Sequence, residues 1–300
     1  MKQTIMLNKN FRVLVTGSNG QLGSELKALS KNYNYHFFFS ARESLDIIDF
    51  RSLKQFILDN QINAIINCAA YTAVDRAEDN DQLELADAIN HLAVRNMAQL
   101  SKELNITLVH ISTDYVFNGE SFKPYLENDS TQPKTVYGQT KLNGEKALIN
   151  INPNNSIIIR TSWVYSSYGN NFVKTMLRLG KDKDSLGVIY DQVGTPTYAR
   201  DLAKVILDIL PKLINDKVEI YNYSNEGVLS WYDFAKVIMD TANLDCKVDP
   251  IETFEYPTPA KRPHYSVLNK AKIKSTFNID IPYWKDSLND CLALLGDKSE

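Results

Sequence analysis

A glycine-rich turn between an apolar segment and a helical segment constrains the fold of this chain more than any other feature. Residues 11–16 indicate a short buried strand, and residues 25–30 have a helical pattern. Gly17, Gly20 and Gly23 stand between them in a G-x-x-G-x-x-G arrangement. Such glycines permit a tight turn, close approach of the backbone to a pyrophosphate, and packing of the helix on the strand. We therefore predict a dinucleotide-binding turn, although a plain β–α turn would show the same order. The residues assigned to it are Gly17, Asn19, Gly20, Gln21, Leu22 and Gly23.

The alternation of strand and helix continues beyond this turn. Patterns of apolar residues indicate strands at 35–39, 64–67 and 107–112, with helices at 50–58 and 83–105 between them. Strands separated by helices pair in parallel through right-handed crossovers. The fold class that we predict is α/β, with a doubly wound parallel (Rossmann-type) sheet and a smaller C-terminal substrate-binding lobe.

No low-complexity linker divides the chain, so the second lobe is expected to be an elaboration of the sheet. Helices are indicated at 171–180, 198–213 and 231–241, and a strand at 188–190. We assign residues 1–165 to the dinucleotide-binding domain and expect elements from about 186–222 to return to it. Residues 166–185 and 223–300 are assigned mainly to the substrate-binding lobe.

Composition narrows the classes of partner and location. The chain has 300 residues, of which 44% are hydrophobic and 23% charged, with a net charge of −3. It has no basic stripe for nucleic acid and no run of about 20 apolar residues for a membrane span. Three widely spaced cysteines suit a reducing compartment, and the dispersed histidines provide no paired spacing for a metal. We expect a cytoplasmic protein without a metal site, nucleic-acid partner or membrane partner.

A tyrosine and a lysine four residues apart are the candidate catalytic pair. Tyr137 and Lys141 open an expected helix, so both side chains lie on one helix face. A cation beside a phenol favours its ionised form, which would make Tyr137 a proton donor for a carbonyl at neutral pH. The same spacing also occurs by chance on exposed helices.

Other segments supply what such a proton donor needs. Thr113 ends the strand at 107–112, and its hydroxyl can hydrogen-bond the same carbonyl oxygen. Ala69, Ala70 and Tyr71 follow the third strand, where small side chains would let a dinucleotide lie close to the backbone. Asn90 interrupts the apolar face of the helix at 83–105, either as a polar residue at its edge or as a buried amide that braces the site.

Together these motifs resemble the extended short-chain dehydrogenase/reductases and, more narrowly, the dTDP-4-dehydrorhamnose reductases. Blocks in family order span nearly the whole chain. Besides the glycine turn, they are 69–75 (AAYTAVD), 112–117 (STDYVF), 136–141 (VYGQTK), 160–165 (RTSWVY), 169–172 (GNNF), 191–197 (DQVGTPT) and 257–263 (PTPAKRP).

The resemblance implies reduction of the 4-keto group of dTDP-4-dehydro-6-deoxy-L-mannose to dTDP-L-rhamnose, for surface polysaccharide. It implies that Tyr137 protonates the oxygen, Thr113 hydrogen-bonds it, and Lys141 holds the nicotinamide ribose. Trp163 is similar to the family's substrate-pocket tryptophan, and its alternative role is that of an aromatic residue in the core. Arg262 is similar to the residue that faces the sugar nucleotide, and its alternative role is that of a solvated surface arginine. The substrate contacts implied are Thr72, Val74, Thr113, Asp114, Tyr115, Trp163 and Arg262.

Cofactor choice depends on the end of the second strand, where an acid favours a 2′-hydroxyl and a cation a 2′-phosphate. Ser40 stands where NAD-selective folds place the acid, and Arg42 can pair with phosphate oxygens. Glu43 is the complication, because it lies about 20 residues past Gly23. Asp46, with Ile47 beside it, resembles the family's aspartate at the adenosine end. We predict that NADPH is preferred and NADH also accepted.

Assembly and function class leave alternatives open. Some family members dimerise through magnesium held by glutamates; Glu25 occupies one such place, but Arg200 stands at another and would repel the metal. We expect no such metal-bridged dimer, and we expect either a monomer or a homodimer of another kind.

The family also resembles the non-catalytic β subunit of methionine adenosyltransferase, so a regulatory subunit is the alternative from another function class. A reductase of a related nucleotide 4-keto sugar is the alternative within enzymes.

Overall fold

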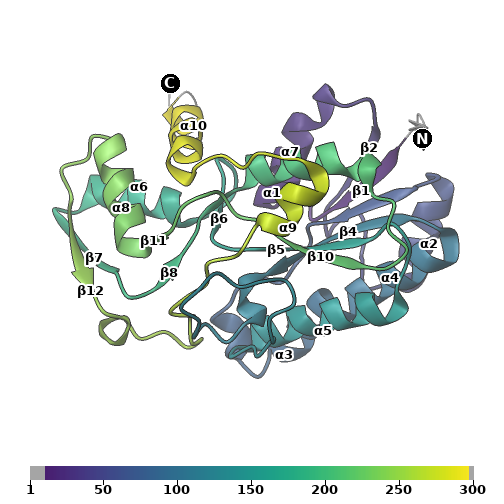
Figure 1. The fold of residues 1–300 in the computed structure, drawn as a ribbon, viewed down its shortest axis with the longest axis horizontal. Coiled ribbons are helices and arrows are strands. Elements are labelled where there is room, and N and C mark those ends of the chain that lie inside the picture. The colour runs from purple at the N-terminus through teal and green to yellow at the C-terminus, as the bar shows by residue number, and fades with distance from the viewer. Residues whose placement is uncertain (1–10, 297–300) are drawn as a thin grey trace.

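A six-stranded, all-parallel sheet organises the computed structural model, which describes residues 11–296 (Figure 1). The strands stand in the order β2–β1–β3–β4–β5–β10. Their bounds are β1 Arg12–Thr16, β2 His36–Ser40, β3 Ala64–Asn67, β4 Thr107–Thr113, β5 Ile157–Thr161 and β10 Glu219–Asn222. This order is the one expected of a doubly wound sheet, and the predicted fold class is confirmed.

The switch in strand order places a crevice at one end of the sheet. From β1 the chain first builds outward to β2 and then returns to β3 on the other side, so Thr16 pairs with both Ser40 and Asn67. The crossovers therefore leave on opposite faces here. Ligands of doubly wound sheets bind at such a point, outside the carboxyl ends of the strands.

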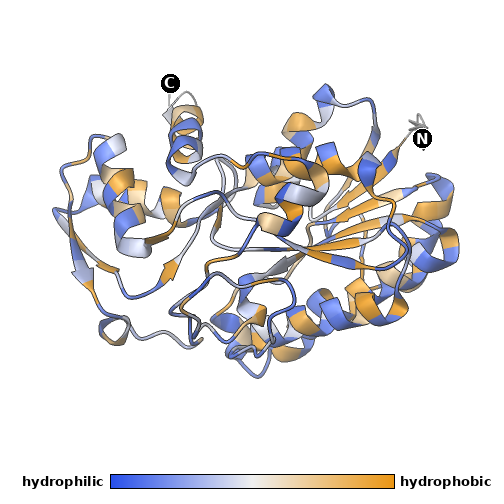
Figure 2. Cartoon of the chain, viewed as in Figure 1, coloured by the Kyte–Doolittle hydropathy of each residue, from blue (hydrophilic) through white to orange (hydrophobic). Residues whose placement is uncertain are grey.

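Helices cover both faces of the sheet. On one face α1 (Gln21–Leu29) packs with α7 (Ala199–Ile209), and α9 (Ala271–Phe277) extends the same core. On the other lie α2 (Phe50–Asp59), α4 (Ala93–Leu104) and α5 (Val136–Ile151). Figure 2 shows apolar strands between helices that turn one apolar side inward. Burial on both faces accounts for strands that are continuously apolar rather than alternating.

Two long predicted helices are interrupted in the structure. The helix expected at 83–105 is α3 (Leu83–Asp87), a π turn at Ala88–Leu92, and α4. The helix expected at 198–213 ends at Ile209 and continues only as a 3-10 turn, Leu210–Lys212. Pro211 explains the second break, because proline lacks the N–H that an α-helix requires.

A smaller lobe forms around a second hydrophobic core, at the left of Figure 1. Its helices are α6 (Phe172–Asp182), α8 (Trp231–Thr241) and α10 (Trp284–Gly296). β7 (Ser185–Ile189) pairs with β12 (Lys247–Ile251), β8 (Val193–Gly194) with β11 (Leu229–Ser230), and β6 (Val164–Tyr165) with β9 (Thr197–Tyr198). Within 186–222, α7 and β10 pack with the sheet domain, whereas β7 belongs to this lobe.

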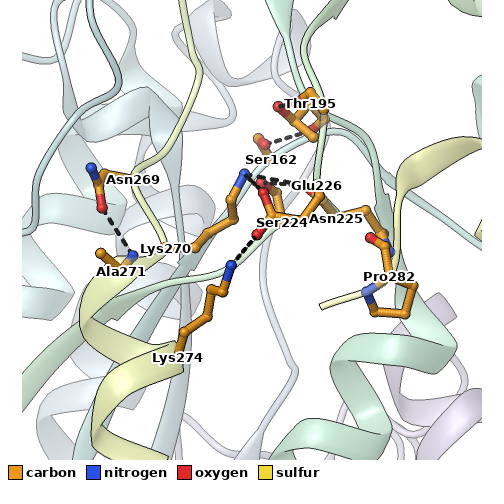
Figure 3. Close-up of polar contacts among 11 residues, drawn as sticks. Ser162, Thr195, Ser224, Asn225, Glu226, Asn269, Lys270, Ala271, Lys274 and Pro282 are labelled. Carbon is orange, nitrogen blue, oxygen red and sulfur yellow. Dashed lines mark hydrogen bonds and ion pairs between the residues drawn. The ribbon is translucent and has the colours of Figure 1, made fainter. Parts of the chain in front are cut away.

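A buried polar junction joins the two lobes beside Asn225 (Figure 3). The Asn225 amide donates to Asp201 of α7 at 2.7 Å and to Ser287 of α10 at 2.8 Å. Lys270, only 8% exposed, donates to the Asn225 carbonyl oxygen at 3.2 Å and pairs with Glu226 at 3.4 Å. Since the buried side chains of Asn225, Lys270 and Ser287 each have a partner from another segment, the junction holds the lobes in one arrangement.

Candidate active site

A cleft of about 880 Å³ lies at the carboxyl ends of β1, β3 and β4, between the sheet and the smaller lobe. Most of the predicted site residues line it. They are Gly17, Gly20, Gln21, Leu22, Ser40, Arg42, Asp46, Ile47, Ala69, Ala70, Tyr71, Thr72, Val74, Thr113, Asp114, Tyr115, Tyr137, Lys141 and Trp163.

Three predicted residues lie outside this lining. Asn19 is exposed in the glycine turn. Gly23 lies in α1, where a Cβ would stand 2.4 Å from the Gly17 carbonyl oxygen, so it serves the packing of helix on turn. Arg262 lines a small neighbouring pocket that shares Tyr115 with the cleft.

The glycine turn brings bare backbone to the cleft. Gly17 has φ +65°, and a Cβ there would lie 2.7 Å from the Ala69 nitrogen of the loop after β3. The Gly20 N–H donates to the Gly17 carbonyl oxygen at 3.0 Å, and α1 begins at Gln21. Side chains at these positions would fill the approach to the helix N-terminus, a preferred place for a pyrophosphate.

Tyr137 stands in the first turn of α5, close to the end of β4. Thr135 caps this helix by accepting from the Gly138 N–H at 3.0 Å. A side chain would not fit at Gly138, because a Cβ there would lie 2.3 Å from the Tyr115 carbonyl oxygen. The lack of a side chain lets the helix start rest on the turn after β4, so Tyr137 and Thr113 come close together and both line the cleft.

Burial dominates the acidity of Tyr137. It raises the pKa of the phenol to about 12, although the nearby Thr113 hydroxyl acts in the opposite direction. The lowering that we expected from Lys141 is therefore wrong for this structure. The Lys141 ammonium points to the backbone instead, donating to the Ile111 carbonyl oxygen at 2.6 Å, and its burial lowers its own pKa to about 8.

A second acid lies directly beside the tyrosine and threonine. The Thr113 hydroxyl donates to Asp114 Oδ1 at 2.9 Å. Asp114 is 3% exposed, and burial raises the pKa of its carboxyl to about 7. The strand end thus presents a hydroxyl and a weakly acidic carboxyl to the same part of the cleft as Tyr137.

Asn90 braces the site from behind, so the second of its two interpretations is confirmed. Its Oδ1 accepts from the Tyr71 N–H at 2.9 Å, and its amide donates to the Tyr71 carbonyl oxygen and to Thr140 Oγ1, each at 3.1 Å. The residue is fully buried in the π turn between α3 and α4. Irregular π turns recur at functional sites because they aim side chains out of helical register.

At the far end of the cleft, the second strand presents no acid. Ser40 is buried, while Arg42 is exposed and lines the cleft. Asp46 also lines it and accepts from the Ile48 N–H at 2.9 Å. Glu43 is exposed and does not belong to the lining.

Trp163 forms part of the opposite wall in a conformation that few tryptophans adopt. Its φ is +47°, and its ring stacks on Trp231 with centroids 3.5 Å apart and planes 11° from parallel. Gly194 lies behind it, where a Cβ would be 2.7 Å from the indole. Left-handed backbone in a bulky residue is strained and persists where the surroundings fix it.

Some contributors to the site were missed by sequence reasoning. Asn171 lines the cleft and donates to Gln21 Oε1 at 2.9 Å, while Gln21 donates to the Val164 carbonyl oxygen at 3.3 Å. The 169–172 block contained Asn171, but the only local signal was its role as the cap of α6. Trp231 and Asp75 were likewise given no role.

Two further observations concern metals and membranes. Glu25 is buried and bonded to Arg200 at 3.3 Å and to the Ser166 hydroxyl at 2.6 Å, so a cation of the chain itself faces that carboxylate. Over residues 11–296 no group of three metal-ligating side chains is present. In the same range no helix is long and apolar enough to cross a bilayer.

Comparisons with known proteins agree with this geometry. A family model described as "RmlD substrate binding domain" matches residues 11–296. A dTDP-4-dehydrorhamnose reductase of Aggregatibacter actinomycetemcomitans is 42% identical over 94% of this chain and 98% of that protein.

Among solved structures, dTDP-4-dehydrorhamnose reductases are also similar to this chain. A dTDP-4-dehydrorhamnose reductase from Clostridium acetobutylicum superposes with a TM-score of 0.90 at 40% identity, covering 95% of this chain and all of that one. The corresponding enzyme from Bacillus anthracis, solved in complex with NADP, has a TM-score of 0.90 at 37% identity, over 95% of this chain and 99% of that one.

Proposed function

This chain belongs to the family of dTDP-4-dehydrorhamnose reductases, and from that premise we propose that it reduces the 4-keto group of dTDP-4-dehydro-β-L-rhamnose to dTDP-L-rhamnose. NADPH is the preferred reductant, and NADH is also accepted. The observation that carries the proposal is the meeting of Thr113, Tyr137 and Lys141 in one cleft that the glycine turn also lines.

The residues present suit a dinucleotide. The bare backbone of Gly17 and Gly20 would receive the pyrophosphate, Arg42 and Asp46 the adenosine end, and Ala69 to Tyr71 the middle of the cofactor. When bound, the reduced nicotinamide supplies the hydride that the keto carbon receives.

The protein's part in the chemistry is to supply a proton and hold the oxygen. With a pKa of about 12, Tyr137 is fully protonated at neutral pH and can give its proton to the oxygen as that atom gains charge. Thr113 would donate to the same oxygen by turning its one hydroxyl hydrogen, which is bonded to Asp114 in this structure, toward the substrate. Lys141 would hold the nicotinamide ribose and stabilise the tyrosinate that remains.

The sugar would lie between the strand end and the tryptophan wall. Thr72, Val74, Asp114 and Tyr115 line this part of the cleft, with Trp163 opposite. Arg262 would meet the diphosphate, since a guanidinium binds phosphate oxygens in a planar fork. We also propose a cytoplasmic reductase, because Cys68, Cys246 and Cys291 form no disulfide bond in the described part of the chain. It would be a monomer or a homodimer.

The decisive experiment is oxidation of NADPH and NADH with the dTDP-4-keto-6-deoxy-L-sugar generated in situ, set against UDP-linked and 2-acetamido counterparts. Turnover with the dTDP sugar above the others supports the proposal, while preference for another sugar makes the chain a related 4-keto reductase. Cofactor binding without turnover of any ketone would favour the regulatory-subunit alternative, which the complete Thr113, Tyr137 and Lys141 set disfavours.

A further inference from the structure

An ion pair joins two loops beside the cleft, one that follows β3 and one that precedes α9. Asp75 follows β3 in the sheet domain, and Arg262 lies in the loop between β12 and α9. Arg262 Nη1 donates to Asp75 Oδ1 at 2.8 Å, and Nη2 donates to Oδ2 at 2.6 Å. This is the bidentate arrangement of a guanidinium on a carboxylate, which fixes orientation as well as distance.

The pairing leaves part of the guanidinium available. An arginine carries five N–H donors in a rigid plane. Nη1 also donates to the Ala260 carbonyl oxygen at 3.2 Å. Within residues 11–296, the Nε–H and the second Nη2 hydrogen of Arg262 meet no protein acceptor. These two donors form a second edge, which can take two oxygens of a phosphate.

The surroundings of Arg262 suit an anion. It lines a small pocket with Lys261, Lys134 and His264, in which Glu120 is the acidic member and faces Lys134 at 3.7 Å. Tyr115 lines both this pocket and the main cleft, and its ring meets that of Tyr137 edge-on at 5.5 Å. The pocket therefore continues the cleft on the substrate side of the proposed proton donor.

We propose that Asp75 is a positioning residue for the nucleotide-sugar substrate, whose carboxylate aims the free edge of Arg262 at the place where the substrate diphosphate would lie. This inference rests on the proposed function. Asp75 itself would not touch the substrate. Its effect would pass through Arg262, and it would act on binding of the diphosphate rather than on proton transfer.

The geometry also allows a simpler role, in which Asp75 only anchors the loop. Its Oδ1 accepts from the Ala260 N–H at 3.1 Å as well. The two roles differ in what happens when Arg262 is absent. Anchoring through Ala260 would continue without the guanidinium, whereas positioning would have nothing left to position.

A double-mutant cycle separates them. Asp75→Asn, Arg262→Met and the double variant are compared with the unmodified protein for KM of the sugar nucleotide, KM of NADPH, kcat and Tm. We expect Asp75→Asn to raise the sugar-nucleotide KM about 10-fold with kcat and the NADPH KM within about 2-fold, and to add less than 2-fold in the Arg262→Met background. An equal effect in both backgrounds, or a loss spread over kcat and the NADPH KM, would overturn the proposal.

The matched control is Glu219→Gln. Glu219 is similarly exposed and pairs with Lys272 at 2.6 Å, but on β10, outside both the cleft and the small pocket. Its loss should leave every kinetic parameter unchanged. A rise of the sugar-nucleotide KM in this variant equal to that of Asp75→Asn would show a general effect of lost ion pairs.

Calorimetric binding of dTDP tests the inference without turnover or the full cycle. The unmodified protein should bind dTDP at least 10-fold more tightly than Asp75→Asn and than Arg262→Lys, because an ammonium cannot replace the planar fork. Equal binding of dTDP by Arg262→Lys would refute the positioning role even if Asp75→Asn did not fold. If the protein showed no turnover but the difference in dTDP affinity between the unmodified protein and the variants persisted, only the proposed reaction would be contradicted.

Discussion

Lys141 donates from its buried ammonium to the carbonyl oxygen of Ile111, 2.6 Å away, and thereby ties helix α5 to strand β4. The bond joins the two elements that carry Tyr137 and Thr113. Lys141 is thus both a candidate ligand for the cofactor and a brace of the proton-donating site. Variants of these residues should separate the two roles.

Replacing Tyr137 with Phe should remove only the proton donor. The ring remains to pack against Tyr115, and the cleft keeps its shape. We expect turnover to fall at least ~100-fold while NADPH binding, followed by fluorescence titration, is retained. Near-normal turnover would remove Tyr137 from the mechanism.

Replacing Lys141 with Met should weaken both cofactor affinity and turnover, because the methionine keeps the length of the side chain but not its charge or donors. Kd for NADPH and kcat measured on the same preparation check this. A change in stability alone, with normal kinetics, would reduce Lys141 to a structural residue.

Lys141→Met should also show how the buried ammonium affects the free energy of unfolding. Since burial lowers the Lys141 pKa to about 8 from 10.5, the unfolded chain binds more protons than the folded one between these pH values. Stability contributed at this position therefore rises with pH across that window. In denaturant unfolding, the free energy of unfolding of the unmodified protein should rise relative to that of Lys141→Met from pH 8 to 10.5. A constant difference between the two proteins would contradict the lowered pKa of Lys141.

Trp163 should depend on the absence of a side chain at Gly194. A methyl group there would lie 2.6 Å from Ser266 Oγ and 2.7 Å from the indole, so the ring must move. We expect Gly194→Ala to lower kcat/KM for the sugar nucleotide about 10- to 100-fold, with NADPH binding unchanged.

Gly187→Ala is the matched control, because the nearest atoms to its Cβ would be those of the Ile251 side chain, at 3.1 Å and beyond. Near-ultraviolet circular dichroism should show a weakened signal from the Trp163–Trp231 stack in Gly194→Ala but not in the control. An unchanged signal together with unchanged kinetics would mean that the wall adapts to the methyl group.

The fold could be predicted from sequence because its signals are local. Gly17, Gly20 and Gly23 lie within seven residues, and a Cβ at Gly20 or Gly23 would meet the Gly17 carbonyl oxygen of the same turn. The first four strands of the sheet are mostly apolar runs, so their positions follow from the local sequence. Asn90 could be noticed for the same reason, as one amide on an otherwise apolar face.

The remaining features depend on contacts between distant segments. Trp231 stacks on a residue 68 positions away, and Asp75 pairs with one 187 positions away. Neither position carries a local pattern. The raised pKa of Tyr137 was missed because desolvation arises only when distant segments, among them those with Tyr71 and Ala86, pack against this residue.

The last prediction concerns the choice between NADPH and NADH. Arg42 is exposed and lines the cleft at the end of β2, where Ser40 provides no carboxylate to compete for it. Glu43 does not line the cleft, so the geometry favours the cation over the acid as the group that faces the ribose. We therefore expect a kcat/KM that favours NADPH in the unmodified protein.

Replacing Arg42 with Ala should weaken NADPH selectively, because only the 2′-phosphate has the charge that a guanidinium binds. We expect kcat/KM with NADPH to fall about 10-fold or more while the value with NADH changes less than 2-fold, and Glu43→Gln should leave both nearly unchanged. Steady-state rates with each cofactor at fixed salt check this, since screening weakens exposed ion pairs. A preference for NADH in the unmodified protein, or equal losses with both cofactors in Arg42→Ala, would place Glu43 rather than Arg42 against the ribose.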